Sequence, residues 1–254
     1  MISVGVAGAA GRMGRLVAAT IAAADDLILT ACYDPASGDS VGTVDVSDDP
    51  GALAGCDVVV EFSNPAAVMA NLKLWHDSGA SAVIGTSGFD EERVAAVADL
   101  WTDETIRCLI VPNFSLGAVL MMKMAALAAP FFPAADIIEL HHDHKLDAPS
   151  GTALATARLM AEAGGRSERA VESDEVVDGA MGAKVGGVPI HSVRLPGLVA
   201  HQQVTLGGPG ETLTVRHDTT DRESFMPGVL LAIRGAGTLE QPVTVGLEPL
   251  LGLD

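Results

Sequence analysis

The first half of this chain alternates short apolar runs with alanine-rich segments of helical period, and this alternation restricts the fold more than any other feature. The apolar runs, which predict strands, span residues 2–8, 27–34, 44–47, 57–62, 81–87 and 106–111. The segments that predict helices span residues 14–24, 65–78 and 90–100. Strands separated by helix-length segments form βαβ units, and continuous apolar strands fit a sheet covered on both faces. The sequence therefore predicts an N-terminal α/β region with a doubly wound parallel sheet.

The pattern changes after Pro112. Helices are expected over residues 116–129, 152–163 and 225–234, and a strand over residues 137–141. Three segments of alternating character, expected to form antiparallel strands, span residues 188–195, 198–206 and 211–217. Such alternation is typical of a sheet that leaves one face exposed. We therefore expect an α+β second half with a mostly antiparallel, open sheet.

The glycine-rich segment GAAGRMG, Gly8 to Gly14, follows the first expected strand and opens the first helix. Small residues let the backbone approach a pyrophosphate, and a helix N-terminus offers free N–H groups and a favourable dipole. Asp34 follows Gly14 by twenty residues, where a carboxylate can accept hydrogen bonds from the ribose of a dinucleotide. The spacing is GxxGxxG instead of the commoner GxGxxG. The alternative is therefore a tight turn in a fold that binds no nucleotide.

The stretch ELHHDHKLDAPSGTA, residues 139–153, concentrates histidine, lysine and carboxylate side chains. If the strand continues through His144, His141 lies on one face of the sheet and His142 lies with His144 on the other. Imidazole can donate a proton near neutral pH, so this stretch is a candidate acid. A zinc site and a solvated polar turn are the alternatives. The zinc site lacks an HExxH motif and a cysteine pair, and Lys145 would repel the cation.

The end of this stretch predicts an anion-binding site. Ser150, Gly151 and Thr152 resemble a helix N-cap followed by exposed N–H groups, a combination that binds carboxylates. Lys145 lies only a few residues before them. An acid beside an anion-binding site accounts for the histidines, the lysine and the helix start together.

Charge and composition restrict the partners. The formal net charge of −18 argues against binding to nucleic acid or to an anionic membrane. No run reaches the length of a membrane span, and the N-terminus lacks a signal-peptide pattern. The three cysteines lie in apolar surroundings, which favours reduced core residues and a cytoplasmic protein. A 2′-phosphate would need a cation near Asp34, but residues 16–72 contain no Lys or Arg, and only Arg12 and Arg15 could reach it. The sequence therefore favours NADH over NADPH.

The residues of the histidine-rich stretch closely resemble the signature of the 4-hydroxy-tetrahydrodipicolinate reductase (dihydrodipicolinate reductase) family of diaminopimelate and lysine biosynthesis. Five further motifs fall in the order of that family: VGVAGAAGRMG, VVEFSNP, GTSGF, PNFSLG and GETLTVRHDTTDRESF. The resemblance covers essentially the whole chain. It implies a Rossmann-like dinucleotide-binding domain over residues 1–112, completed by residues 222–254. A substrate-binding and oligomerisation domain over residues 113–221 would form a homotetramer through its open sheet.

The resemblance also implies residue roles. His141 and Lys145 would be the proton donors, while His142, Ser150, Gly151 and Thr152 would hold the carboxylates of a cyclic dicarboxylate substrate. The cofactor-binding residues implied are Gly8, Ala9, Ala10, Gly11, Arg12, Met13, Asp34, Phe62, Gly85, Thr86, Ser87, Val111, Pro112, Asn113 and Phe114. No metal is implied.

The expected reaction is hydride transfer from NADH or NADPH to C4 of the ring, with loss of water and protonation by His141 or Lys145. Hinges near Pro112 and Arg222 would close the two domains. The chain departs from many family members at Pro35 and Asn64, where they carry arginine, and both departures agree with NADH as the favoured cofactor. The rival functions are an amino-acid dehydrogenase such as an aspartate dehydrogenase, a catalytically silent nucleotide-binding regulator, and a metal-dependent hydrolase.

Overall fold

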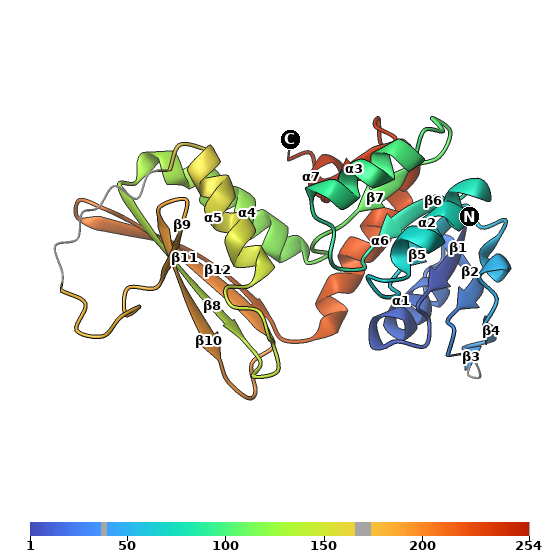
Figure 1. The fold of residues 1–254 in the computed structure, drawn as a ribbon, viewed down its shortest axis with the longest axis horizontal. Coiled ribbons are helices and arrows are strands. Elements are labelled where there is room, and N and C mark those ends of the chain that lie inside the picture. The colour runs from blue at the N-terminus through green and yellow to red at the C-terminus, as the bar shows by residue number, and fades with distance from the viewer. Residues whose placement is uncertain (37–39, 166–173, 254) are drawn as a thin grey trace. The chain divides into compact units, whose positions relative to one another are not determined.

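The computed structural model describes residues 1–36, 40–165 and 174–253 (Figure 1). The chain forms two compact units. Unit 1 contains Met1–Ser115 together with Phe225–Asp254, and unit 2 contains Leu116–Ser224. No helix among the described residues is long and apolar enough to cross a membrane.

Unit 1 is built on an eight-stranded sheet with the strand order β13-β7-β6-β5-β1-β2-β4-β3. Its strands are β1 (Ile2–Ala7), β2 (Leu27–Tyr33), β3 (Ser40–Val41), β4 (Val44–Ser47), β5 (Val58–Glu61), β6 (Ser81–Ile84), β7 (Cys108–Ile110) and β13 (Val243–Val245). Its helices are α1 (Arg12–Ala22), α2 (Val68–Asp77), α3 (Glu91–Leu100), α6 (Met226–Gly235) and α7 (Glu248–Leu251), with short 3-10 turns η1 (Pro50–Leu53) and η4 (Ala236–Thr238). Among the described strands, every neighbouring pair is parallel except β3 with β4.

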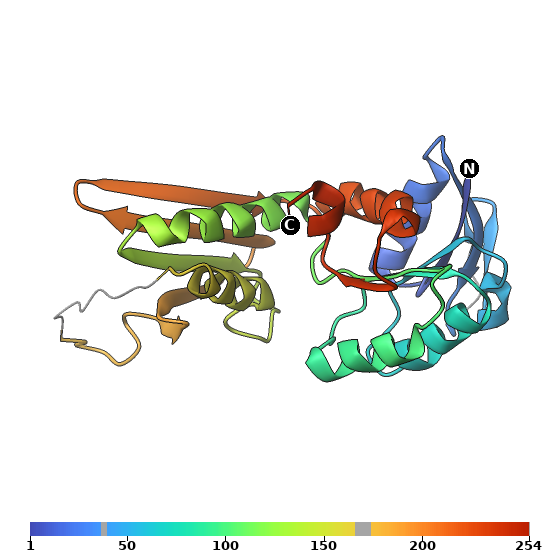
Figure 2. The ribbon, with the colours of Figure 1, turned by 90° about the horizontal axis from the view of Figure 1, so that it is seen from above.

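The doubly wound parallel sheet expected from the sequence is confirmed. Figure 2 shows α1 and α6 on one face of the sheet and α2 and α3 on the other. Every residue of the central strands β5 and β6 is buried, because both faces are covered. The short edge strands β3 and β13 were not predicted, since two or three residues carry no readable period. Cys32, Cys56 and Cys108 are free and buried, as expected.

Unit 2 is built on a five-stranded sheet with the strand order β12-β11-β8-β10-β9. Its strands are β8 (Ala134–His141), β9 (Ala183–Val185), β10 (Val188–Arg194), β11 (Ala200–Gly208) and β12 (Glu211–Thr219). Its helices are α4 (Leu116–Ala128) and α5 (Gly151–Glu162), with the 3-10 turns η2 (Ala129–Phe131) and η3 (Arg222–Phe225), the last of which ends at the unit boundary. The sheet is mostly antiparallel, as predicted. The exception is β10, which the alternation alone predicted as antiparallel and which pairs parallel with β8.

One face of this second sheet packs against α4 and α5. Ile137, Ile190 and Val204 reach the core from three adjacent strands, and Met121 and Met160 reach it from the helices. The opposite face is open and carries Ile138, His191, His201, Arg216 and Asp218, which register and alternation place on the same side. The side of each strand on which a residue lies therefore decides whether it can reach the start of α5.

Candidate active site

Glycines shape the loop between β1 and α1. Gly8 has φ +79, and a Cβ there would lie 2.5 Å from the carbonyl oxygen of Phe62. At Gly14 a Cβ would lie 2.0 Å from the carbonyl oxygen of Gly8, so the first turn of α1 packs directly on the loop. The N-cap of α1 is Gly11, no side chain caps the helix, and its first turn holds no acidic residue. Arg12, Met13 and the loop residues Ala9 and Ala10 thus stand at a helix N-terminus open to an anion.

Asp34 lies directly after β2 and faces the glycine loop. Its Oδ2 accepts a hydrogen bond of 3.1 Å from the backbone N–H of Ala10, and its Oδ1 accepts one of 2.9 Å from that of Ala36. Each carboxylate oxygen keeps a second lone pair, because a carboxylate can accept about four hydrogen bonds. The structure therefore brings Asp34 next to the loop, as the sequence predicted.

Three further predicted cofactor residues meet at the ends of β5, β6 and β7. The rings of Phe62 and Phe114 lie 5.4 Å apart, and a Cβ on Gly85 would lie 2.2 Å from the Phe62 ring. Thr86 is buried and donates a hydrogen bond from Oγ1 to the carbonyl oxygen of Glu61. Of the other predicted residues in these loops, Val111 is buried, Asn113 is half-buried, and Ser87 and Pro112 are exposed.

The buried carboxylate of Glu61 is a functional candidate that the sequence reasoning did not single out. Glu61 is 0% exposed and ends β5. It accepts hydrogen bonds from the backbone N–H of Ser63, from Asn71 Nδ2 and from Trp75 Nε1, at 2.9, 3.1 and 3.0 Å. These bonds fix the start of the loop that carries Phe62. An acidic residue inside an otherwise apolar strand was the signal available in the sequence.

In unit 2 the strand β8 ends at His141. The strand therefore does not continue through His144, and the alternation proposed for His142 and His144 does not apply. Glu139 and His141 stand two residues apart in β8, so both point to the face that α4 and α5 cover. On the neighbouring strand β10, Arg194 pairs with His141 and shares that face.

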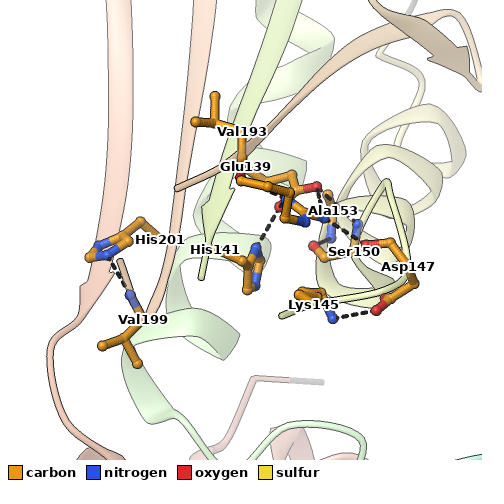
Figure 3. A network of polar contacts seen from close by, with 10 residues as sticks. Glu139, His141, Lys145, Asp147, Ser150, Ala153, Val193, Val199 and His201 are labelled. Atoms are coloured by element: carbon orange, nitrogen blue, oxygen red, sulfur yellow. Dashed lines mark hydrogen bonds and ion pairs between the residues drawn. The ribbon is translucent and has the colours of Figure 1, made fainter. Parts of the chain in front are cut away.

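Glu139 lies at the centre of a hydrogen-bond network (Figure 3). Its Oε2 lies 2.5 Å from His141 Nδ1, and the Arg194 guanidinium donates to Oε2 and Oε1 at 2.9 and 2.8 Å. The backbone N–H of Ser150 donates to Oε1 at 3.2 Å. Burial raises the pKa of Glu139, but the hydrogen bonds from His141 and Arg194 outweigh it and lower the pKa to about 2. The carboxyl group is therefore ionised at neutral pH.

Lys145 and His142 follow in the turn after β8. The ammonium of Lys145 lies 2.8 Å from Asp147 Oδ1, and its backbone N–H donates to the carbonyl oxygen of His142. The hydrogen bond from Lys145 lowers the pKa of Asp147. His142 Nδ1 is buried and has no hydrogen-bond partner within the described part of the chain. The side chain of His144 is 89% exposed, and its ring lies 6.3 Å from that of His142.

The N-cap predicted at Ser150 is confirmed. Ser150 Oγ accepts a hydrogen bond of 3.2 Å from the backbone N–H of Ala153, and Gly151 begins α5. Gly151 is exposed and Thr152 half-buried, while Ser150 is buried. Figure 3 shows His141, Lys145 and Ser150 gathered beside the start of this helix. The arrangement offers an imidazole, an ammonium and helix N–H groups to one anionic ligand.

Two features of this site were missing from the sequence reasoning. Arg194 had no assigned role because it lies fifty-five residues from Glu139 in the chain and only the sheet register joins them. Glu139 was seen within the stretch but given no role. Among the residues that the structure describes, no group of three or more His, Cys, Asp or Glu side chains is placed to hold a metal ion.

Two family models together cover nearly all of this chain. Residues 2–114 match the model described as dihydrodipicolinate reductase, N-terminus. Residues 117–251 match the model described as dihydrodipicolinate reductase, C-terminus.

Curated relatives are similar over their full length. The chain is 50% identical over 254 residues to 4-hydroxy-tetrahydrodipicolinate reductase of Mycolicibacterium vanbaalenii, which covers 98% of this chain and 99% of that protein. It is 48% identical over 259 residues to the enzyme of the same name from Cutibacterium acnes, which covers 100% of both.

Solved structures agree with these relatives. Dipicolinate-bound dihydrodipicolinate reductase from Paenisporosarcina sp. TG-14 matches with a TM-score of 0.87 and 38% identity, over 98% of this chain and 99% of that one. A probable dehydrogenase from Thermotoga maritima matches with a TM-score of 0.66 and 14% identity, over 99% and 93% of the two chains. This second likeness concerns the fold alone.

Proposed function

The chain belongs to the dihydrodipicolinate reductase family, and on that premise we propose that unit 1 binds the nicotinamide cofactor while His141 and Lys145 of unit 2 act as proton donors. The protein is an oxidoreductase of diaminopimelate and lysine biosynthesis that reduces 4-hydroxy-tetrahydrodipicolinate with NAD(P)H. The observation that carries the assignment of the site is the grouping of His141 and Lys145 beside the N-terminus of α5.

Unit 1 fits a dinucleotide. The absence of side chains at Gly8 and Gly14 lets the loop pack tightly against the residues after β5 and against the first turn of α1, and the uncapped start of α1 supplies N–H donors for a pyrophosphate. Asp34 offers carboxylate lone pairs to the ribose, and Phe62, Gly85 and Phe114 form an apolar contact surface. We assign the cofactor to these residues and to the neighbouring Ala9 to Met13, Thr86 to Ser87 and Val111 to Asn113.

Unit 2 fits a planar dicarboxylate. The N–H groups of Gly151 and Thr152 lie at the start of α5, which favours one carboxylate, and Lys145 adds a positive charge. His142, whose buried Nδ1 has no hydrogen-bond partner among the residues that the structure describes, is a further polar candidate. A dianionic ligand would compete with Asp147 for the Lys145 ammonium, since Asp147 is exposed and its bond to Lys145 lies at the surface.

The chain's own residues handle the proton. When bound, the nicotinamide supplies a hydride to C4 of the ring as water leaves. In its charged form the His141 ring carries a proton on each nitrogen, and the proton at Nε2 is the one that it can donate to the substrate. Donation of that proton to the reduced ring, or donation from Lys145, completes the reduction, and solvent then reprotonates the donor.

The reaction is tested with purified protein and substrate made in place by the synthase that produces 4-hydroxy-tetrahydrodipicolinate. We expect substrate-dependent oxidation of the reduced nicotinamide, followed by its absorbance, and no activity with aspartate and the oxidised cofactor. Oxidation of aspartate instead would favour the amino-acid dehydrogenase alternative.

We further propose that NADH is preferred over NADPH. The surface after β2 carries Asp34 and Pro35, and residues 16–72 hold no Lys or Arg. The nearest cation in sequence, Arg15, already donates from Nε to the carbonyl oxygen of Ala10 at 3.0 Å. Apart from Arg12, which is exposed at the start of α1, a 2′-phosphate would therefore meet a carboxylate without a nearby cation. The measurement is kcat/KM for both cofactors, and a higher value with NADPH would contradict the proposal.

We also propose that the protein forms a homotetramer through the open face of the five-stranded sheet. We further propose that it is located in the cytoplasm. The open face exposes 38% of Ile138 in the middle of the sheet. Sedimentation velocity at several concentrations tests the assembly, and a monomer at all of them would reject it. The three free, buried cysteines support a reducing compartment.

A further inference from the structure

Glu139 is a buried charge that the proton-donor proposal does not use. It is 0% exposed, and its pKa of about 2 keeps it ionised. Removing a carboxylate from water costs several kcal/mol, which only close partners can offset. The negative charge of Glu139 therefore acts on the few groups that contact it directly.

Both oxygens of Glu139 are used by partners from three segments. The Arg194 guanidinium from β10 binds both oxygens in a bidentate fork, at 2.9 and 2.8 Å. The backbone N–H of Ser150 fixes Oε1 from the start of α5, and His141 Nδ1 meets Oε2 at 2.5 Å. Ser192, which lies opposite Glu139 on β10, adds a further side-chain hydrogen bond, and together these donors hold the plane of the carboxylate that the imidazole contacts.

The bond to His141 selects the ring's tautomer. An ionised carboxylate only accepts hydrogen bonds, so Nδ1 must carry the proton and Nε2 is left for the ligand. When Nε2 is also protonated, the imidazolium retains a charge-assisted bond to Glu139. This is the form that a proton donor must occupy before each turnover.

The charged groups near the ring on β10 and in the turn after β8 have partners of their own. Arg194 on β10 is neutralised by Glu139, and it also donates to the carbonyl oxygen of Asp147 at 2.7 Å. Lys145 in the turn is paired with Asp147. On β11, the residues that share this face are Ala200 and Gln202, and neither is charged. Glu139 is thus the carboxylate that contacts the His141 ring.

We propose that Glu139 and Arg194 are positioning residues for His141: Glu139 holds the ring with Nδ1–H inward and Nε2 outward, and Arg194 fixes the carboxylate that does so. The inference rests on the proposed role of His141 as proton donor. Arg194 has a second task, because its bond to the Asp147 carbonyl also holds the segment that carries Lys145.

Substitutions of Glu139 and of Arg194 should therefore have different effects on kcat and on ligand binding. Glu139→Gln should lower kcat at least ~10-fold, as losses of orienting carboxylates do, with KM for the substrate changed less than about threefold. Arg194→Lys keeps the charge but loses the fork, so it should lower kcat and also weaken binding of pyridine-2,6-dicarboxylate. The matched control is Asp26→Asn, which removes an exposed carboxylate from a bidentate fork with Arg234 in unit 1 and should leave both parameters unchanged.

The tautomer of His141 can be measured in ligand-free protein without catalysis, so this measurement tests the inference independently of the proposed function. Nitrogen-15 NMR of the ligand-free wild-type protein, with His141 assigned by comparison with His141→Gln, should show the ring predominantly protonated at Nδ1. In Glu139→Gln the Nε2–H tautomer should gain population. Wild-type protein with Nε2–H as the main neutral form overturns the inference, whether or not the protein reduces the substrate. If wild-type protein lacks reductase activity but shows the Nδ1–H ring, the proposed function fails and the positioning stands.

Folding of the variants does not decide the outcome. Should Glu139→Gln fail to fold, the wild-type tautomer and the Arg194→Lys variant still test the pair. Unchanged kcat in a folded Glu139→Gln protein, with unchanged cofactor binding, rejects the inference.

Discussion

At the scale of single residues, His141 and Lys145 are close together but differ in their partners. His141 is held through Nδ1 by a buried carboxylate, whereas Lys145 is paired at the surface with Asp147. A proton donor should affect the chemical step, and an ammonium such as that of Lys145, which is 23% exposed beside the anion site, should also affect binding of an anion.

We therefore expect His141→Gln to lower kcat by at least ~100-fold with little change in affinity for NADH, because general acids contribute about 10²–10⁴ in rate. Lys145→Ala should lower turnover and also weaken binding of a planar pyridine dicarboxylate. Steady-state kinetics and inhibitor titration measure both. Unchanged kcat in His141→Gln would refute its role as acid, and normal inhibitor affinity in Lys145→Ala would remove that residue from the site.

The ionised Glu139 also has a consequence for acid stability. Its pKa of about 2 in the folded protein lies below the ordinary value of 4.5, so its contribution is complete above pH 4.5 and is lost as the pH falls towards 2. The difference corresponds to at most roughly 3 kcal/mol. Urea unfolding should show Glu139→Gln less stable than wild type at neutral pH, with the gap narrowing through this window.

Asp26→Asn is the comparison for this measurement. Hydrogen bonds from Arg234 lower the pKa of Asp26, but that carboxylate is half exposed, so water screens the pair. The gap between wild type and Asp26→Asn should be small at every pH. A gap for Glu139→Gln that stays constant from pH 5 to about 2 would contradict the lowered pKa.

At this scale the sequence predicted roles for residues that act through local geometry. Ser150 as a helix cap and the closeness of Lys145 to it follow from neighbours within a few positions. Arg194 could not be linked to Glu139, because nothing in the chain specifies that β10 lies parallel to β8. Partners joined only through sheet register require the structure.

At the scale of elements, two helix N-termini are built differently. The start of α1 has no side-chain cap and depends on glycine packing, whereas Ser150 caps α5. A substitution at the start of α1 should therefore disturb backbone packing, whereas a substitution of Ser150 should remove a hydrogen bond.

Gly14→Ala should abolish cofactor binding and destabilise unit 1. The new Cβ would lie 2.0 Å from the Gly8 carbonyl oxygen, so α1 or the loop must move. Isothermal titration with NADH and thermal unfolding measure the two effects. Gly42→Ala is the comparison, since its Cβ would meet nothing within 4 Å and only the strain at φ +61 remains. NADH affinity in Gly14→Ala equal to that of wild type would show that the loop tolerates the shift.

Ser150→Ala should cost about 1 kcal/mol of stability, because the N–H of Ala153 loses its cap. We also expect weaker dicarboxylate binding, since the first turn of α5 frays. Ser150→Thr restores a neutral cap at this buried position beside the ionised Glu139. That variant should recover both the stability and the binding, and binding that stays equal to wild type in Ser150→Ala would argue against a carboxylate at this helix start.

Elements of six or more residues were predicted well, and very short strands were not. The long helix after Pro112 was expected over residues 116–129 and is α4, Leu116–Ala128. β9 and β13 have three residues each, too few for a period, and they form only because an existing sheet edge offers them partners.

At the scale of the whole molecule, the net charge of −18 opposes the approach of an anionic substrate and cofactor. Local donors at α1, α5 and Lys145 bind these anions at short range, but the long-range field remains unfavourable. We expect kcat/KM to rise with KCl from a few millimolar to about 0.1 M, where the Debye length falls to ~10 Å. Sucrose, which is uncharged, should have no such effect. A steady decrease with KCl would mean that the local cations dominate the field.

The chain path of unit 1 has a consequence for the order of synthesis. β1 and α1 leave the ribosome before unit 2, yet α6 packs against α1 and β13 pairs with β7 at the sheet edge, and both of these elements lie within Phe225–Asp254, after unit 2 in the chain. Unit 1 therefore cannot be completed until this second segment has emerged, whereas all residues of unit 2 are available earlier. A nascent chain stalled near residue 224 should expose the edge of β7 and the side of α1 that α6 covers. Such an intermediate would be a natural client for a chaperone at the ribosome.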